Sequence, residues 1–258
     1  MYIDTHAHIN DEAYNNESPE NLLKRAKEDG VKYVIAPGVN IESSRQLKDY
    51  SEKFPGVFFA SGIHAHEASK FYEKDFLEIK HLLEHPKAVA VGEVGLDYHY
   101  EFSSRTLQKH VLSRFLKLAI SIDMPMIIHC REAEEDFYSM LKEMPKIPRG
   151  VIHCYTGDVK WAKKFLDMGF YLGFTGIITF NKSEEMRDVV RNTPIDRILT
   201  ETDSPYMTPS PRRKIRPNEP RFVTFVADKI AEIKGLKKEE ALPVFVKNAE
   251  KCFGIELK

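Results

Sequence analysis

The stretch Tyr2-Ile3-Asp4-Thr5-His6-Ala7-His8 opens the chain, and it sets the frame for the rest of the sequence. Tyr2 and Ile3 are typical of the start of a buried strand. Because side chains alternate faces in an extended strand, His6 and His8 share one face. Neutral imidazole is the commonest protein ligand for zinc-like metals. A His-x-His pair also occurs without a metal, so a metal site here depends on partners later in the chain.

Short apolar runs alternate with amphipathic helical stretches along the whole sequence. Ser18 predicts the N-cap of a helix that begins at Pro19 and ends before Gly30. After the opening strand, we expect strands at 33–36, 57–61, 88–91, 125–128, 151–152, 170–174 and 197–200. We expect helices at about 19–29, 42–54, 74–83 and 105–122, and then a helix that follows His129 and ends at Leu141. Further helices are expected around 161–166 and at 184–190, 219–233 and 238–253.

This alternation of strands and helices predicts a parallel sheet. Eight such units in 258 residues match the size of a closed α/β barrel. An open doubly wound sheet is the alternative, but it would usually have a Gly-rich phosphate loop after its first strand, where His-x-His stands here. We therefore predict an α/β fold, a (β/α)8 TIM barrel, with a single domain over residues 1–258.

Composition narrows the class of protein further. The sequence is 42% hydrophobic and 30% charged, as in an ordinary globular enzyme. The net charge of −1 offers no broad basic field for coating nucleic acid, although local phosphate contacts remain compatible with it. We see no signal-like start and no run of about 18 apolar residues. Three cysteines without framework spacing indicate a reducing compartment, so we expect a cytoplasmic monomer with no membrane partner.

Polar residues that bind metals recur at the ends of the predicted strands. The carboxyl ends of all strands in a parallel barrel meet at one mouth, so these side chains are expected to converge. Convergent polar groups in a concave site are the usual mark of function. The residues are His6 and His8 after strand one, His64 after strand three, Glu93 after strand four, His129 after strand five, His153 after strand six and Asp203 after strand eight.

The donor set predicts the kind of metal site. Imidazoles and carboxylates without thiolates suit Zn²⁺, Mn²⁺ or Mg²⁺. Even six of these seven residues exceed the number of ligands that one catalytic ion needs, so we expect two divalent ions with Glu93 placed to bridge them. Cys130 and Cys154 directly follow strand-end histidines and are expected to face the helices as core packing, and Cys252 is expected to be structural.

Taken in order, these motifs resemble the TatD family of metal-dependent deoxyribonucleases, within the amidohydrolase superfamily of TIM barrels. The resemblance covers essentially the whole chain. It departs from the family pattern where His64-Ala65-His66 replaces the usual His-Pro-His, and where Asn181-Lys182 follows Phe180 instead of Lys. The matching stretches are Asp4-Thr5-His6-Ala7-His8, Gly92-Glu93-Val94-Gly95-Leu96-Asp97-Tyr98, His129-Cys130-Arg131, His153-Cys154-Tyr155-Thr156-Gly157, Glu201-Thr202-Asp203-Ser204-Pro205-Tyr206, Arg216-Pro217-Asn218-Glu219-Pro220 and Asn248-Ala249-Glu250.

The resemblance implies a nuclease and a set of site residues. Its implied metal ligands are His6, His8, Glu93, His129, His153 and Asp203. Asp203 and Glu93 are the expected catalytic residues, with Asp203 taking the proton from a metal-activated water. His64, Arg131 and Arg216 are candidate phosphate contacts, with ordinary loop salt bridges as the alternative. Glu201 joins this substrate-side group as a base or extra ligand, or else orients a ligand through a hydrogen bond.

The predicted function is metal-dependent cleavage of phosphodiester bonds in DNA, expected on single strands and from an end. Two other classes stay open. A hydrolase of another ester or an amide could use the same barrel and metal site, because neither fixes the scissile bond. A metal-binding regulator without catalysis is the second, and the intact Asp203 with its full ligand set argues against it.

Overall fold

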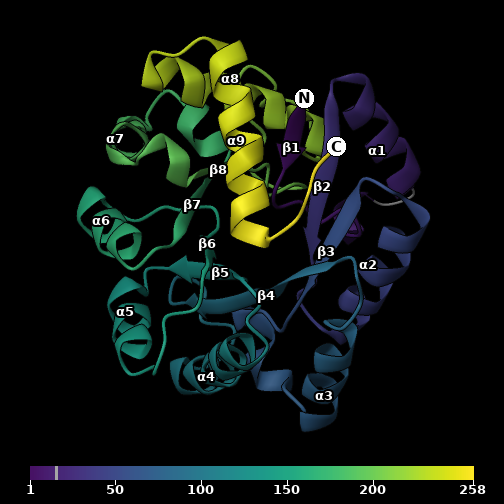
Figure 1. Cartoon of the computed structure of the whole chain (residues 1–258), viewed down its shortest axis with the longest axis vertical. Coiled ribbons are helices and arrows are strands. Elements are labelled where there is room, and N and C mark those ends of the chain that lie inside the picture. Colours follow the sequence, from purple (N-terminus) through teal and green to yellow (C-terminus); the bar gives the residue numbers. More distant parts are fainter. Residues whose placement is uncertain (15–16) are drawn as a thin grey trace.

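A computed structural model describes residues 1–14 and 17–258, and its eight strands form one parallel sheet in chain order (Figure 1). The strands are β1 (Tyr2–Asp4), β2 (Val31–Pro37), β3 (Val57–Ser61), β4 (Ala88–Asp97), β5 (Met126–Arg131), β6 (Gly150–Ile152), β7 (Tyr171–Phe174) and β8 (Ile198–Thr200). Every pair of neighbours from β1 to β8 is parallel.

Helices surround the strands and connect them. They are α1 (Pro19–Glu28), α2 (Ile41–Lys53), α3 (Glu73–Leu82), α4 (Arg105–Ser121), α5 (Glu134–Lys142), α6 (Val159–Asp167), α7 (Glu184–Asn192), α8 (Val223–Lys234) and α9 (Lys238–Phe253). The predicted start of α1 is confirmed, because Ser18 Oγ accepts a hydrogen bond from the backbone N–H of Asn21 at 3.2 Å, with Pro19 first in the helix.

The sheet closes where β8 meets β1. Thr5 donates its backbone N–H to the carbonyl of Thr200 at 3.1 Å, and Thr200 Oγ1 donates to the carbonyl of Ile3 at 3.1 Å. Past the named strands, Ala7 and Ser204 form a parallel bridge. The predicted (β/α)8 barrel is therefore confirmed.

Two apolar layers fill the molecule. The inner one lies inside the barrel, where Ile3, Ile127 and Leu199 pack against Phe253 and other residues of α9. In Figure 1, α9 lies across the middle of the ring of strands. Asn248 of α9 donates to the backbone carbonyls of Ile195 and Ile198, next to the start of β8. This helix therefore covers the end of the barrel where the strands begin.

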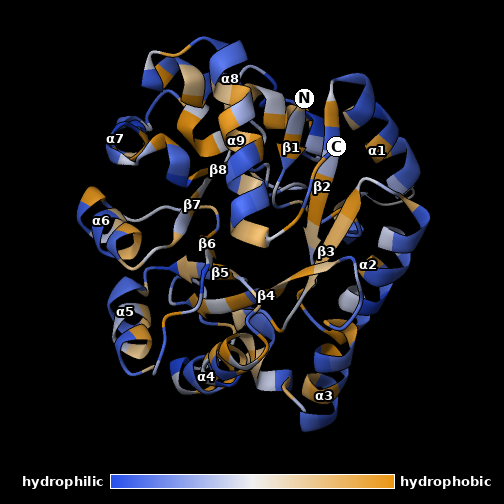
Figure 2. Cartoon of the chain, in the orientation of Figure 1, coloured by the Kyte–Doolittle hydropathy of each residue, from blue (hydrophilic) through white to orange (hydrophobic). Residues whose placement is uncertain are grey.

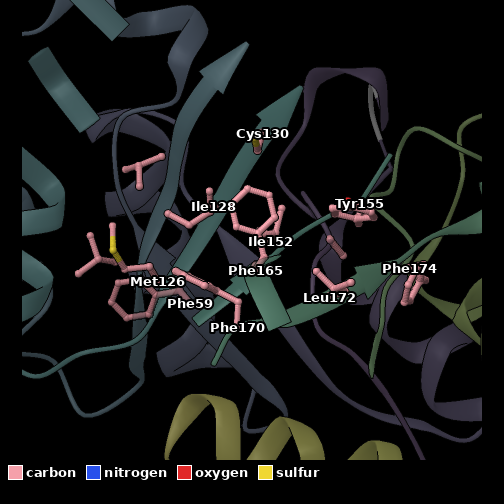
Figure 3. Close-up of a cluster of buried hydrophobic side chains, with 14 of the residues drawn as sticks. Phe59, Met126, Ile128, Cys130, Ile152, Tyr155, Phe165, Phe170, Leu172 and Phe174 are labelled. Atoms are coloured by element: carbon pink, nitrogen blue, oxygen red, sulfur yellow. The ribbon is translucent and has the colours of Figure 1, made fainter. Parts of the chain in front are cut away.

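The outer layer lies between the strands and the helices. Figure 3 shows part of it, with side chains of β5 and β7 packed beside Phe165 of α6. Within β5, Met126, Ile128 and Cys130 belong to this outer layer, whereas Ile127 belongs to the inner one. Figure 2 shows the resulting pattern, since β2 and β3 are mainly hydrophobic and the helices α1 and α2 outside them mainly hydrophilic.

Two element boundaries differ from the sequence prediction. β4 continues past Val91 to Asp97, so Glu93 lies within the strand rather than after it. Gly95 permits this, because a Cβ there would lie 1.8 Å from the carbonyl oxygen of His129 on β5. The helix expected from Glu219 instead begins with a 3-10 turn at Pro220–Phe222, and α8 follows it. Within the described residues, no helix is long and apolar enough to cross a membrane.

Candidate metal centre

The mouth of the barrel gathers the polar residues that follow its strands. The first group contains His6, His8 and Asp203. His6 Nε2 lies 3.2 Å from His8 Nε2, and Asp203 Oδ1 lies 3.8 Å and 3.6 Å from these two nitrogens. The backbone fixes this arrangement, since Asp203 donates its N–H to the carbonyl of His6 at 2.9 Å and His8 donates to that of Ser204 at 2.8 Å. The closure of the barrel thus builds the first group.

The second group surrounds one oxygen of Glu93. Glu93 Oε1 lies 2.8 Å from His153 Nε2, 3.0 Å from His129 Nδ1 and 3.2 Å from His64 Nε2. From the sequence, His64 was predicted to contact a phosphate. In the structure its ring faces Glu93, as the ring of His129 does. Three groups of ligand atoms that could hold a metal follow from this geometry: His6 with His8 and Asp203, His6 with Glu93 and His153, and His64 with Glu93 and His129.

Glu93 stands between the two groups. Its Oε2 atom lies 3.3 Å from His6 Nε2 and 3.5 Å from His8 Nε2, whereas Oε1 contacts the other three rings. The carboxylate is 2% exposed and therefore makes its contacts within the cluster. A carboxylate with one oxygen toward each of two ligand groups has the geometry of a bridge between two cations.

The spacing of the ring nitrogens fits a divalent ion. His6 Nε2 and His8 Nε2 face each other at 3.2 Å, and so do His129 Nδ1 and His153 Nε2. Ligands at about 2.0–2.2 Å from one zinc ion lie roughly 3.4 Å apart in a tetrahedral arrangement. Converging lone pairs at this spacing, with carboxylates beside them, suit a cation more than an empty space.

Burial and charge decide the protonation of the cluster. Burial lowers the pKa of His6 to about 3 and that of His64 to about 4, so both rings are neutral and available as ligands at pH 7. Burial alone would raise the pKa of Glu93, but neighbouring histidines, among them His153 and the hydrogen-bonded His129, outweigh it and hold that pKa well below its usual value. Asp203 follows the same pattern, because its hydrogen bond with His8 overcomes burial and lowers its pKa.

His129 differs from the other rings. Burial would lower its pKa, but hydrogen bonds with Asp97 and Glu93 overcome this and raise the pKa to about 9. A histidine must be neutral to bind a metal, so occupation of this group requires the loss of a proton. Metal affinity on this side of the cluster should therefore rise with pH.

Asp97 was not singled out from the sequence as a site residue, although it ends β4. Its Oδ2 atom lies 2.9 Å from His129 Nε2 and 2.9 Å from His66 Nε2. This contact orients the ring of His129 so that Nδ1 faces Glu93, as carboxylates commonly do for ligating histidines. The signal was present in the sequence, because Asp97 lies four residues after Glu93 in the same strand-end motif.

Glu201 lies beneath the cluster, inside the barrel. The residue has no exposed surface. Its Oε1 atom accepts a hydrogen bond from the backbone N–H of Cys154 and lies 3.8 Å from His153 Nδ1. Burial raises its pKa well above the usual value and favours the protonated carboxyl. Its place next to Gly173 leaves no room even for a Cβ on that glycine. Glu201 thus lies beside the His153 ring without exposed surface, a position that favours the orienting role, which is one of the alternatives predicted from the sequence.

The two arginines expected at the phosphate differ in position. Arg131 ends β5, and its guanidinium carbon lies 4.9 Å from the centre of the Tyr100 ring. Arg216 is exposed in the segment that joins β8 to α8, and within the described residues it has no hydrogen bond or ion pair to the cluster. The structure brings Arg131 alone of these two toward other residues of the mouth.

Cys154 does not face the helices as expected. It has a positive φ of 41°, its backbone N–H points to Glu201, and its Sγ lies 3.5 Å from Thr175 Oγ1. The strand ends at Ile152, so the alternation that predicted an outward side chain no longer applies two residues later. Cys130, in contrast, lies within β5 and packs in the outer layer as predicted.

The sequence matches one known family along nearly its whole length. The model of the family described as TatD related DNase matches residues 3–254. The chain belongs to this TatD family. The membership confirms the expected resemblance, and with it the prediction of a metal-dependent hydrolase that acts on ester bonds.

Relatives of this TatD family member carry two kinds of names. An uncharacterized metal-dependent hydrolase of Bacillus subtilis, YabD, is 38% identical over 256 residues, which cover 99% of this chain and 100% of the relative. A 3'-5' ssDNA/RNA exonuclease TatD of Citrobacter rodentium is 32% identical over 244 residues, with 93% of each chain covered.

Solved structures agree with the fold. The crystal structure of a TatD homolog from Escherichia coli, YJJV, has a TM-score of 0.92 and 28% identity, and the match covers 99% of this chain and 98% of that one. An organophosphorus hydrolase from Deinococcus radiodurans has a TM-score of 0.66 at 14% identity and covers 98% of this chain and 92% of its own. The second likeness concerns the barrel fold alone.

Proposed function

We propose that this TatD family member hydrolyses phosphodiester bonds of single-stranded DNA from an end, with two divalent ions held at the mouth of the barrel. The observation that carries the proposal is the position of Glu93, whose two carboxylate oxygens face two different groups of ligand atoms. Relatives named as 3'-5' ssDNA/RNA exonucleases supply the substrate class. The ions are Zn²⁺, Mn²⁺ or Mg²⁺, which the imidazole and carboxylate donors suit.

Two sets of side chains at the mouth would hold the two ions. His6, His8 and Asp203 would hold one ion, His129, His153 and His64 surround the other side of Glu93, and Glu93 would bridge. When bound, such a pair of ions activates water and stabilises the attacking and leaving oxygens of the phosphodiester. The protein side chains would position the substrate and accept the proton of the attacking water.

The open side of the cluster indicates where a substrate enters. The side chains of His6, Glu93 and His153 are at most 3% exposed, whereas those of Asp203 and His129 are 12% and 17% exposed. His8 and His64 are also partly exposed, at 12% and 10%, so a phosphate would approach on the side where these four residues lie. Asp203, ionised because its pKa is lowered, accepts the proton of the attacking water there.

The proposal is tested with metal-free protein and defined substrates. The protein is stripped with EDTA and reloaded with Zn²⁺, Mn²⁺ or Mg²⁺, and a single-stranded oligonucleotide labelled at its 5′ end is incubated with each form. Stepwise shortening should require a metal, and dipeptides and hydantoins should stay intact under the same conditions. Shortening that survives exhaustive EDTA treatment would remove the metal from the mechanism.

The same assay decides the alternative substrate class. Turnover of an amide or a small ester, with the oligonucleotide left intact, would replace the nuclease with another hydrolase on the same barrel. Because the net charge is near zero, oligonucleotide binding should involve only a few phosphates and depend weakly on salt. The protein is expected to act as a monomer, and size-exclusion chromatography with light scattering measures this directly.

A further inference from the structure

Two aromatic side chains are left uncovered in the segment between β4 and α4. Tyr100 is 51% exposed and Phe102 is 67% exposed, the highest value of any large hydrophobic residue in the part of the chain that is described. Their rings are stacked, with centroids 5.5 Å apart and planes 12° from parallel. Exposed apolar surface gathered in one place commonly marks an interaction site.

Hydrogen bonds at both ends hold this segment in place. Asp97 Oδ1 accepts the backbone N–H of Tyr100 at 2.9 Å. On the other side of the rings, Ser103 Oγ donates to the carbonyl of His66 at 2.9 Å and accepts the N–H of Ser69 at 2.9 Å. The ring pair is therefore presented by a fixed backbone and is not the tip of a loose loop.

The ring pair lies next to the metal cluster. The His66 ring is 4.8 Å from Phe102 on one side and 6.1 Å from His129 on the other, measured between ring centres. His66 Nε2 also lies 2.9 Å from the Asp97 oxygen that orients His129. His66 thus lies between the ring pair and the metal cluster and contacts both.

A positive charge completes the surface. The guanidinium carbon of Arg131 lies 4.9 Å from the centre of the Tyr100 ring. Among the described residues, no carboxylate lies within ion-pair distance of Arg131, so its donors are free for another anion. A planar cation beside aromatic rings suits a phosphate joined to a stacked base.

We propose that Tyr100, Phe102 and Arg131 form a stacking subsite for an unpaired nucleobase next to the scissile phosphodiester. The inference rests on the proposed function and deepens it, because it names what the enzyme recognises beyond the phosphate. Aromatic faces accept any base, since every base has a π-face. A paired base in a duplex has both faces covered, so the subsite favours single strands.

The first test measures binding and cleavage separately. A fluorescently labelled single-stranded oligonucleotide is titrated with the full chain in EDTA, which gives a Kd without cleavage, and KM and kcat are measured with metal. Phe102→Ala should raise both Kd and KM about 5- to 150-fold, the usual range for loss of one stacked base. It should lower kcat less than it raises KM. Phe102→Trp should restore binding and Phe102→Leu should not.

A matched control and the base itself complete the test. Tyr72→Ala removes an aromatic side chain that is 61% exposed just before α3 and for which no contact with the ring pair is found among the described residues, so it should change neither Kd nor KM. In oligonucleotides with one abasic position at a time, one position should lower wild-type affinity as much as Phe102→Ala does. At that position, the variant should add no further loss.

The outcomes distinguish the two proposals. Wild-type protein that binds the oligonucleotide but does not cleave it would overturn the proposed function, while Kd still tests the subsite. Equal Kd and KM for wild type and Phe102→Ala would overturn the subsite and leave the nuclease intact. If Phe102→Ala weakened binding to double-stranded and single-stranded DNA equally, the subsite would also be overturned, because the loss would point to a role other than base stacking. Protein that neither binds nor cleaves would overturn both.

Discussion

The two ends of this barrel are built from opposite kinds of residue. At the end where the strands begin, α9 fills the interior with apolar side chains such as Val246 and Phe253. At the other end, the same strands lead into buried histidines and carboxylates, of which Glu93 and His153 are at most 3% exposed. One end buries apolar surface from water, and the other buries charge.

This difference separates stability from chemistry. Apolar burial stabilises the fold by about 25 cal/mol for each square ångström removed from water. Buried ionisable groups cost free energy unless a partner or a cation compensates them. A cluster such as the one at the mouth is therefore retained for its function, as conserved strand-end positions are in other barrels of this kind. Substitutions at the two ends should thus have opposite effects on turnover and on stability.

The largest effect is expected at Asp203. Asn at this position keeps the shape and one neutral oxygen ligand but cannot accept a proton. Asp203→Asn should lower kcat by roughly 10²–10⁴, the usual contribution of a positioned acid or base. The melting temperature of the metal-free protein should change little, and Asp167→Asn, at an exposed position at the end of α6, serves as the control. A variant that retained full turnover would remove Asp203 as the base.

The reverse result is expected at the opposite end. Phe253→Ala removes a ring that is 4% exposed from the apolar plug of the barrel. Its free energy of unfolding should fall by about 3–5 kcal/mol, as for other buried Phe to Ala changes. At a temperature where the variant is folded, kcat should equal the wild-type value. Leu77→Ala, at a position 58% exposed, should cost less than about 0.5 kcal/mol in the same denaturant titrations.

The two cysteines after the strand-end histidines give a finer version of the comparison. Cys130 lies in the outer apolar layer, so a hydroxyl there has no partner, and Cys130→Ser should cost about 1–3 kcal/mol of stability. Cys154 lies at the mouth, where a hydroxyl can reach Thr175 Oγ1, so Cys154→Ser should cost less than about 1 kcal/mol. Equal losses for the two variants would contradict the placement of Cys154.

These cysteines also show where sequence reasoning succeeds and where it fails. Strand alternation correctly placed Cys130, because β5 is regular through Arg131. Strand alternation failed at Cys154, because the backbone has left the strand there and has a positive φ, which the pattern of side chains does not predict. The convergence of histidines at the mouth was predictable, since parallel topology alone brings strand ends together.

Pairings across the mouth could not be derived in the same way. That His66 and His129 share the carboxylate of Asp97 depends on the register between β4 and the loop after β3, which the hydrophobic pattern leaves undetermined. The position of α9 in the barrel was likewise not predicted, because its contacts with the inner layer join residues as far apart in sequence as Ile3 and Phe253. Long-range contacts of this kind are set by the closed barrel and not by local sequence.

A further effect is a pH dependence of stability that originates at Glu201. Its pKa is raised in the folded chain, so the carboxyl is protonated when folded and ionised when unfolded above about pH 4.5. Unfolding then releases a proton, and this contribution to stability declines as pH rises. The stability of metal-free Glu201→Gln should therefore rise relative to that of the wild type as the pH increases above about 4.5. A flat difference would mean that the carboxyl is ionised in the folded protein.

The central claim is that the mouth holds two ions with Glu93 between them. Elemental analysis of the metal bound per chain, after saturation with Zn²⁺ and removal of free ion, tests it most directly. The geometry of the two ligand groups predicts two ions for the wild type. A single ion per chain at saturation would contradict the bridge and reduce the site to a one-metal hydrolase.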